Sequence, residues 1–109
     1  MKTPLTPDAA ELIAHRFLAL SDPTRLRIVD LLRTREGASV RELTDALGTS
    51  QQNVSKHLAT LHAEGFVSRR KQGTSSIYAI ADPSVFDLCE QVCGGIEAQL
   101  AAVGEALSA

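Results

Sequence analysis

Two short helical patterns separated by a single glycine occupy residues 39–65, SVRELTDALGTSQQNVSKHLATLHAEG. Ser39 followed three residues later by Glu42 is the pattern of a capping box, which predicts that the first helix begins here. Apolar residues then recur at helical spacing, at Val40, Leu43 and Leu47. Gly48 ends this helix, and two helices joined by so tight a turn are typical of a helix-turn-helix. We therefore assign residues 39–64 to that motif.

The second helix of the pair has an apolar face and a polar face. Its apolar residues fall at helical spacing, at Val54, Leu58 and Leu61. The residues that then point outward are Gln52, Lys56, Ala59 and Ala63, with Ser55 at the edge. Glutamine can pair with adenine through two hydrogen bonds, and lysine can reach guanine or a phosphate. This face predicts base reading in a DNA groove, and the alternative is an ordinary solvated helix face.

The first turn of this second helix favours contact with a phosphate. Thr49 or Ser50 is expected to be the N-cap, and Gln51 follows them. The free backbone N–H groups and the positive end of the helix dipole attract anions at such a position. His57 lies near the boundary of the apolar face, where an imidazole either packs in the core or contacts a phosphate.

Residues 66–80, FVSRRKQGTSSIYAI, change from helical to strand character. Apolar and β-branched residues flank a turn near Gln72-Gly73, which predicts a β-hairpin. Basic residues lie on its first arm, and a threonine lies at its tip: Arg69, Arg70, Lys71 and Thr74. Such an arm can bind the sugar-phosphate backbone of DNA, although charge on a hairpin can also simply prevent edge-to-edge pairing.

The net charge of −2 conceals an uneven distribution along the chain. Residues 50–78 contain four basic residues and one acidic residue, whereas residues 79–109 contain five acidic residues and no lysine or arginine. A basic middle beside an acidic end favours one surface for a polyanion and another kept away from it.

The flanking segments are predicted to be helical, giving a single domain over residues 1–109. Thr6-Pro7 is a typical helix start, and one apolar stripe follows it: Leu12, Ile13, Phe17 and Leu20. The next helix begins at Ser21 or Asp22 and ends near Gly37. Leu26, Val29 and Leu32, or neighbouring apolar residues, are expected to point inward from it. The fold class is mainly α with a small β-hairpin.

The predicted last helix, residues 83–107, contains both cysteines of the chain, in the stretch DLCEQVCGG. They belong to a heptad seam with spacings of three and four: Phe86, Cys89, Cys93, Ile96, Leu100, Val103 and Leu107. Reduced cysteine packs as a small apolar residue, so packing is one interpretation of the pair. Gly94 and Gly95 weaken the helix, which is consistent with a kink, a break or a close helix crossing. Asp87 and Glu90 would raise a thiol's pKa and make it less reactive.

Three stretches together resemble the ArsR/SmtB family of bacterial winged-helix repressors: LSDPTRLRIVDLL, SVRELTDALGTSQQNVSKHLATLHAEGFV and RRKQGTSSIYAI. The resemblance covers nearly the whole chain and implies a homodimer, formed through the first and last helices, that binds an operator and releases it when a small effector binds. The recognition-helix contacts implied are Ser50, Gln51, Gln52, Ser55, Lys56 and His57, and the wing contacts are Arg69, Arg70, Lys71 and Thr74. Two-fold related helices read half-sites about 34–36 Å apart, so we expect double-stranded DNA with an inverted repeat.

Metal-sensing members of this family use cysteines on the helix before the recognition helix, or histidine and acidic residues on the last helix. Here residues 39–47 contain no cysteine and residues 79–109 contain no histidine, so neither site is present in its usual form. Cys89 and Cys93 leave a thiol-only site, for arsenite or another thiophilic metal or metalloid, or for oxidation or persulfide chemistry. Structural zinc needs four ligands, so the partner subunit would have to complete an ion site. No cofactor is required.

Other function classes fit the sequence less well. No nucleophile, base and orienting group occur together, so we do not expect an enzyme. The N-terminal residues lack the apolar core of a signal peptide, and no stretch is long enough to span a membrane, which predicts a cytoplasmic protein. The remaining alternative is a winged-helix protein-interaction module that does not bind DNA and whose cysteines are purely structural.

Overall fold

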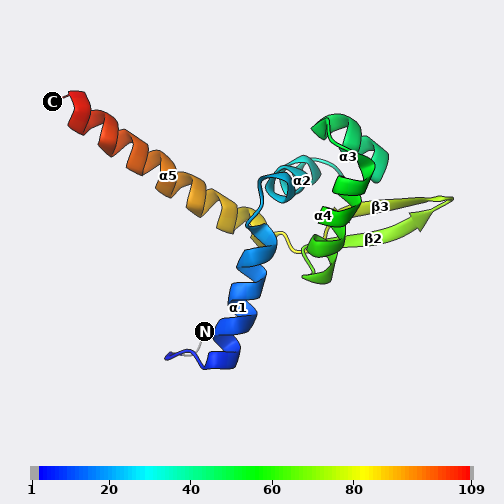
Figure 1. Cartoon of the computed structure of the whole chain (residues 1–109), viewed down its shortest axis with the longest axis horizontal. Helices are drawn as coiled ribbons and strands as arrows, with labels where there is room; N and C mark the ends of the chain where they lie inside the picture. The colour runs from blue at the N-terminus through cyan, green and yellow to red at the C-terminus, as the bar shows by residue number, and fades with distance from the viewer. Residues whose placement is uncertain (1–2, 109) are drawn as a thin grey trace.

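The computed structural model describes residues 3–108, and the side chains of residues 3–105. Five helices and three short strands follow one another along this part of the chain (Figure 1). Their bounds are α1 Pro7–Leu20, α2 Pro23–Arg33, β1 Ala38–Ser39, α3 Val40–Leu47, α4 Gln51–Ala63, β2 Val67–Gln72, β3 Ser75–Ile80 and α5 Ser84–Ser108. The predicted mainly helical fold with one hairpin is confirmed.

The sheet has one strand more than the sequence indicated. β2 and β3 form the predicted antiparallel hairpin, and β1 pairs with the other edge of β3, with Ala38 opposite Tyr78. Gly37 lies just before β1, and a Cβ atom there would stand 2.6 Å from Cγ2 of Ile77. This glycine therefore permits the close approach of the chain to β3. It does not end α2, which already ends at Arg33.

One apolar core lies between α2, α3, α4 and the base of the hairpin. The residues predicted to point inward from the helix-turn-helix are confirmed: Leu43, Val54, Leu58 and Leu61 are fully buried, and Val40 and Leu47 pack against them. In α2 the inward residues are Ile28, Val29 and Leu32, whereas Leu26 is 43% exposed. Leu26 instead lines an open groove on the side of α2 that faces α5, so the prediction for this residue was wrong.

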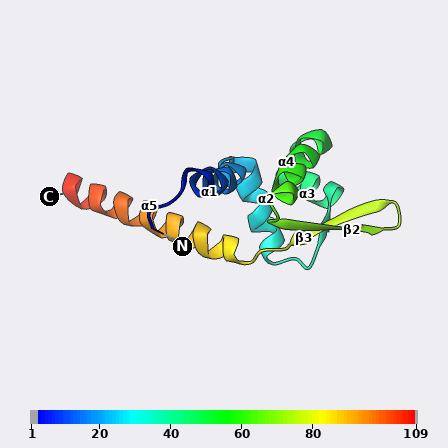
Figure 2. The same ribbon diagram turned by 90° about the horizontal axis from the view of Figure 1, so that it is seen from below.

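Helices α1 and α5 project from this core in different directions (Figures 1 and 2). The stripe predicted on α1 is largely uncovered, since Leu12 is 72% and Phe17 53% exposed and only Leu20 is buried. The seam of α5 packs on the core at Phe86 and Cys89, but its later members are exposed: Cys93, Ile96, Leu100 and Val103. The side chain of Leu107 lies outside the described residues.

Helix α5 continues through Gly94 and Gly95 without a break. A Cβ atom at either glycine would have no neighbour within 4 Å among the described residues.

The described part of the chain contains no helix with the length and apolar character needed to cross a membrane.

Candidate DNA-binding surface

The turn between α3 and α4 has the local geometry that the sequence predicted. Ser39 Oγ accepts from the Glu42 N–H, and Glu42 Oε1 accepts from the Ser39 N–H, both at 3.1 Å, so the capping box is confirmed. These hydrogen bonds hold the pKa of the Glu42 carboxyl below its usual value. Gly48 adopts a left-handed conformation with φ of 70°, which ends α3 as expected.

Ser50 is the N-cap of α4. Its Oγ accepts from the Asn53 N–H at 3.1 Å, and Thr49 Oγ1 accepts from Asn53 Nδ2 at 3.2 Å. Of the two predicted capping residues, Ser50 therefore makes the backbone contact, while Thr49 fixes the side chain of Asn53. Gln51 and Gln52, in the first turn of α4, are exposed, and the N-terminal turn of a helix is a place where an anion can bind.

The outward face of α4 is polar and includes small side chains. Gln51, Gln52, Ser55, Lys56 and Ala59 are all exposed, whereas the residues of the opposite face are completely buried. Ser55 and Ala59 have small side chains, so α4 can approach the floor of a groove closely beside them. This is the arrangement that the helical spacing predicted.

His57 does not belong to this face. It is 7% exposed and lies on the core side of α4, with Nδ1 3.0 Å from Nη1 of Arg25. At 100° per residue its Cβ lies about 60° from that of Val54 and about 100° from that of Leu58, at the edge of the apolar face. Of the two interpretations open for this residue, packing applies, and we remove His57 from the set of candidate DNA contacts. Arg25, which the sequence did not single out, is the residue that holds it.

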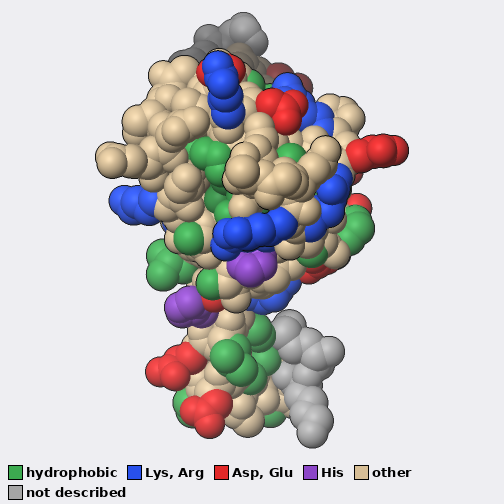
Figure 3. Space-filling view, turned by 90° about the vertical axis from the view of Figure 1, so that its right-hand side faces the viewer, with side chains coloured by type: hydrophobic (Ala, Val, Ile, Leu, Met, Phe, Trp, Pro, Cys, Tyr) green, Lys and Arg blue, Asp and Glu red, His purple; other side chains and the backbone are tan. Residues whose placement is uncertain are grey.

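The wing presents its charged side chains from β2. Arg69 Nε donates to Ser76 Oγ at 3.2 Å and Arg70 Nη1 donates to Gln72 Oε1 at 3.1 Å, while Lys71 is exposed. Thr74 lies at the tip, beside Gly73 with φ of 63°. Figure 3 views the end of the molecule from which the wing projects, and several Lys and Arg side chains lie across the middle of this face.

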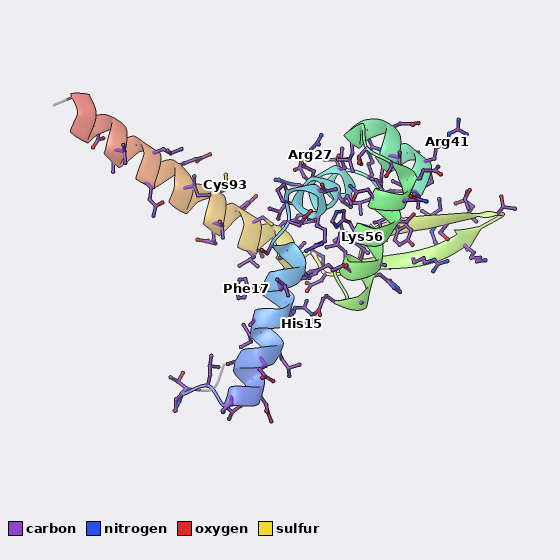
Figure 4. All side chains as sticks on the ribbon, in the orientation of Figure 1. His15, Phe17, Arg27, Arg41, Lys56 and Cys93 are labelled. Atoms are coloured by element: carbon purple, nitrogen blue, oxygen red, sulfur yellow. The ribbon has the colours of Figure 1, made fainter. Side chains whose placement is uncertain are left out.

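Both cysteines lie on α5, and Figure 4 shows Cys93 well away from the wing. Cys89 is half-buried, and burial is the main cause that raises the pKa of its thiol. Cys93 is exposed, and its Sγ is 3.6 Å from Oε1 of Glu97, whose carboxylate raises the pKa of the Cys93 thiol. Glu90 raises the pKa of Cys93 further, as expected, but Asp87 does not act on either thiol, and the larger effect on Cys93 comes from Glu97, one helical turn further on. Both cysteines are free thiols.

A groove of about 620 Å³ runs beside these thiols, between the end of α1, α2 and α5. Its walls are mostly apolar, and the two sulfur-bearing residues lie among Phe17, Leu26, Phe86 and Ile96. Arg33 closes one side by lying over the Phe86 ring, 5.7 Å from its centroid, and 3.7 Å from Glu90. The described residues contain no group of three or more His, Cys, Asp or Glu side chains that could hold a metal ion. One chain therefore offers a soft ion two thiols at most.

This arrangement of a capped two-helix motif, an exposed polar helix face and a basic hairpin defines a winged helix-turn-helix protein. A family model described as a helix-turn-helix domain matches residues 20–70. The probable mercury resistance operon repressor of Streptomyces lividans is 41% identical over 75 residues, which cover 69% of this chain and 59% of that protein. The transcriptional repressor SmtB homolog of Synechocystis is 33% identical over 90 residues, which cover 83% of this chain and 67% of that protein.

A solved structure extends the same comparison. The homodimeric winged helix-turn-helix domain of Mb0332 from Mycobacterium bovis, described as a possible ArsR-family transcriptional regulator, superimposes with a TM-score of 0.73 at 27% identity. The match covers 91% of this chain and 94% of that one. The chain therefore belongs to the ArsR/SmtB family of winged-helix, DNA-binding transcriptional regulators.

Proposed function

We propose that this chain is a homodimeric transcriptional repressor that binds an operator with an inverted repeat and leaves it when a thiophilic effector binds to α5. The observation that carries the proposal is the exposed polar face of α4 beside a basic wing. The contact residues proposed are Thr49, Ser50, Gln51, Gln52, Ser55, Lys56, Arg69, Arg70, Lys71 and Thr74.

These residues divide into two groups by what they can recognise. Gln52, Ser55 and Lys56 lie on the part of α4 that can enter a major groove, where side chains meet base edges. The wing cations and the first turn of α4 have the chemistry for phosphate, which supplies affinity with little sequence information. We assign sequence reading to the first group and orientation on the duplex to the second.

The dimer is proposed to form through α1 and α5. Their uncovered apolar side chains have no partner within the described chain: Leu12, Phe17, Leu18, Val92, Ile96, Leu100 and Val103 are each more than half exposed. A second copy of the same chain can cover such surfaces symmetrically. This arrangement would place two α4 helices on successive turns of B-DNA, about 34–36 Å apart.

The effector site is proposed at Cys89 and Cys93. Side chains four residues apart on a helix share one face, and thiolates are the preferred ligands of soft ions such as Hg²⁺ or As(III). Both thiols must lose a proton when an ion binds, and their raised pKa values make that loss more costly at neutral pH. The similarity to a mercury resistance repressor supports this class of effector. Because the pair lies on the proposed dimer helix, an ion there would alter the spacing of the two α4 helices.

DNA binding is tested with duplexes selected by the purified protein from a random pool. Fluorescence anisotropy should show tighter binding to the selected duplex than to a shuffled duplex of the same composition, and the affinity should fall steeply with salt. A selected sequence with two-fold symmetry is the expected result. Failure to bind any duplex at low salt would instead favour the interaction module without DNA binding.

The effector is tested by adding Hg²⁺, arsenite, Cd²⁺, Zn²⁺ or polysulfide to the preformed protein–DNA complex. At least one of these should release the wild-type protein, and the Cys89→Ser/Cys93→Ser variant should stay bound. Adding Ser21→Cys to that double variant gives the matched control for thiol chemistry, because Ser21 lines the same groove but follows α1 and is not part of α5. If the double variant retains every response of the wild type, the cysteines do not form the effector site.

A further inference from the structure

A polar cluster behind α4 joins it to the corner between α1 and α2. We call Asp22, Arg25 and His57 the corner cluster. Asp22 and Arg25 come from the start of α2, and His57 comes from the middle of α4. None of these three residues faces the DNA side of α4, and none lies on the groove beside the cysteines. The proposed function therefore leaves the cluster without a role.

Arg25 uses all three nitrogens of its guanidinium group within this cluster. Nε donates to the carbonyl of Ala19 at 2.5 Å, and Nη2 donates to the carbonyl of Leu18 at 3.2 Å. These carbonyls belong to the last turn of α1, where the dipole favours a cation, and the Leu18 carbonyl also accepts from the Ser21 N–H. The third nitrogen, Nη1, lies 3.0 Å from Nδ1 of His57. One side chain thus connects the end of α1 with the middle of α4.

The direction of the remaining contacts follows from the donor chemistry. Because arginine has only donors, Nδ1 of His57 must accept, which leaves the ring hydrogen on Nε2. Nε2 faces Oδ2 of Asp22 at 3.7 Å. The same carboxylate oxygen accepts from the Arg25 N–H at 3.0 Å and caps α2. Arg25 is thereby hydrogen-bonded to both other members, and the Asp22 carboxylate lies beside the ring without a hydrogen bond to it.

This geometry specifies the rotation of α4 more closely than apolar packing does. Val54, Leu58 and Leu61 define which side of α4 faces the core, but apolar contacts tolerate small rotations and slides. A hydrogen bond to a buried ring does not, since its geometry is lost within a few tenths of an ångström. Gln52 and Lys56 lie on the same helix within two turns of His57, so their approach to base edges depends on this rotation.

We propose that Arg25 is a positioning residue for sequence reading: through His57 it fixes the rotation of α4 relative to α1, and so the register of Gln52 and Lys56 on the bases. The proposal rests on the proposed function, because it assumes that α4 reads DNA. Arg25 touches no base and no phosphate in this assignment. Its loss should therefore reduce discrimination between DNA sequences while leaving the general attraction to DNA unchanged.

The test compares Arg25→Met with Arg27→Met in the full-length protein. Arg27 is on the same helix, is exposed, and has no hydrogen bond or ion pair with any residue that the structure describes, so its loss removes the same charge without disturbing the cluster. The ratio of affinities for the selected and shuffled duplexes should fall about tenfold or more in Arg25→Met, the order expected from one misaligned base contact, and stay near the wild-type ratio in Arg27→Met. The dependence of affinity on salt should not change in Arg25→Met.

His57→Phe provides a second test that preserves a ring in the core. It removes the acceptor of Arg25 and should lower the same ratio, and the effects of Arg25→Met and His57→Phe should not add, because both break one contact. If Arg25→Met fails to fold by circular dichroism, His57→Phe decides the question.

The possible results separate the inference from the function on which it rests. A wild-type protein that does not distinguish the two duplexes overturns the proposed function. Where the wild type does distinguish them, an unchanged ratio in the folded Arg25→Met or His57→Phe variant overturns the inference alone. It is also overturned if Arg25→Met flattens the salt dependence, which would indicate a phosphate contact, or if Arg27→Met has an equal effect.

Discussion

The central part of this molecule, from α2 to β3, buries most of its apolar side chains, and we call it the closed half. The flanking helices α1 and α5 leave most of their apolar side chains exposed, and we call them the open half. The buried apolar residues lie between Ala19 and Val85, and the large exposed ones lie in residues 5–26 and 92–103. Inside the central part, the start of every helix is capped, and no buried side-chain N or O atom of the described residues lacks a hydrogen-bond partner. In α1 and α5 the apolar side chains extend beyond any surface that the same chain supplies. The central part is thus held together by its own residues, whereas the apolar faces of the flanking helices are the surfaces that we propose a second copy of the chain covers.

The same pattern of apolar residues therefore has two outcomes in one chain. Spacings of three and four in α4 lead to complete burial, because α2, α3 and the hairpin surround that helix. The same spacings in α5 leave Ile96 and Leu100 more than half exposed. Periodicity identifies which face of a helix is apolar, but what covers that face is decided by topology.

The largest effect is expected from a charge placed on the open half. Leu100→Glu puts a carboxylate in the seam of α5 without disturbing the closed half, because Leu100 is 65% exposed in the single chain. We expect a monomer with near-wild-type circular dichroism, and an operator affinity about 100-fold lower or worse, since only one half-site can be held at a time. Analytical ultracentrifugation and anisotropy provide the two measurements.

Gln91→Glu is the matched control, since it adds the same charge at an exposed position on the face of α5 opposite the seam. It should remain a dimer with nearly unchanged affinity. If Leu100→Glu is also a dimer, the open half is covered by something other than a second copy through this seam.

A smaller effect is expected when one base-reading side chain is shortened in the closed half. Gln52→Ala should lower affinity for the selected duplex about tenfold while changing affinity for the shuffled duplex little, because a bidentate amide–adenine pair discriminates by about 1–3 kcal/mol. Gln91→Ala, at an exposed glutamine of α5, is the control. Equal weakening on both duplexes would assign Gln52 to the DNA backbone.

A change in the wing should alter salt dependence more than selectivity. Arg70→Ala should weaken binding to both duplexes alike and reduce the slope of log affinity against log salt by about 0.9, the value for one lost phosphate contact. Arg33→Ala removes the same charge beside α5, where Arg33 contacts Glu90 and Phe86, and should leave the slope unchanged. An unaltered slope in Arg70→Ala would contradict phosphate contact by this residue.

Replacing glycine by alanine should change the free energy of unfolding in opposite directions in the two halves. Gly48→Ala should lower the free energy of unfolding by about 1 kcal/mol or more, because Gly48 has a φ of 70° that L-residues adopt only with strain. Gly95→Ala should raise it by up to about 1 kcal/mol, because a helical glycine outside the seam gains helix propensity and a Cβ there meets open space. Urea unfolding at fixed protein concentration measures both. A destabilising Gly95→Ala would indicate a close helix crossing at that position.

Local signals in the sequence were sufficient for the closed half. Ser39 with Glu42, the left-handed Gly48 and the buried Leu58 follow from rules that depend on a few neighbouring residues. The misplaced features depend on contacts distant in sequence. From the sequence alone Gly37 resembles a helix C-terminus, and only the structure shows that it lies against Ile77 of β3. Strand β1 is too short to show a strand pattern.

The candidate site was predictable only for its outward-facing residues. Helical spacing located Gln52 and Lys56, but it left His57 between two interpretations because that residue lies at the edge of the apolar face. Its partner Arg25 is 32 positions earlier in the chain, and only the packing of α2 against α4 brings the two together. The effect of Glu97 on Cys93 was, in contrast, available from an i, i+4 spacing.

The smallest expected effect concerns the reactivity of the Cys93 thiol on α5. The pKa of Cys93 is raised mainly by the Glu97 carboxylate, which lies 3.6 Å from the sulfur and opposes a second negative charge. Removing that charge in Glu97→Gln should lower the pKa, increase the thiolate fraction at pH 8, and speed alkylation of Cys93 by iodoacetamide a few fold. The difference should disappear well above the pKa of both proteins, where each thiol is ionised. Glu11→Gln removes an equal charge from α1 and should leave the rate unchanged. Mass spectrometry of the alkylated peptide measures the rates, and equal rates in Glu97→Gln and wild type would mean that the carboxylate turns away from Cys93 once α5 meets its partner.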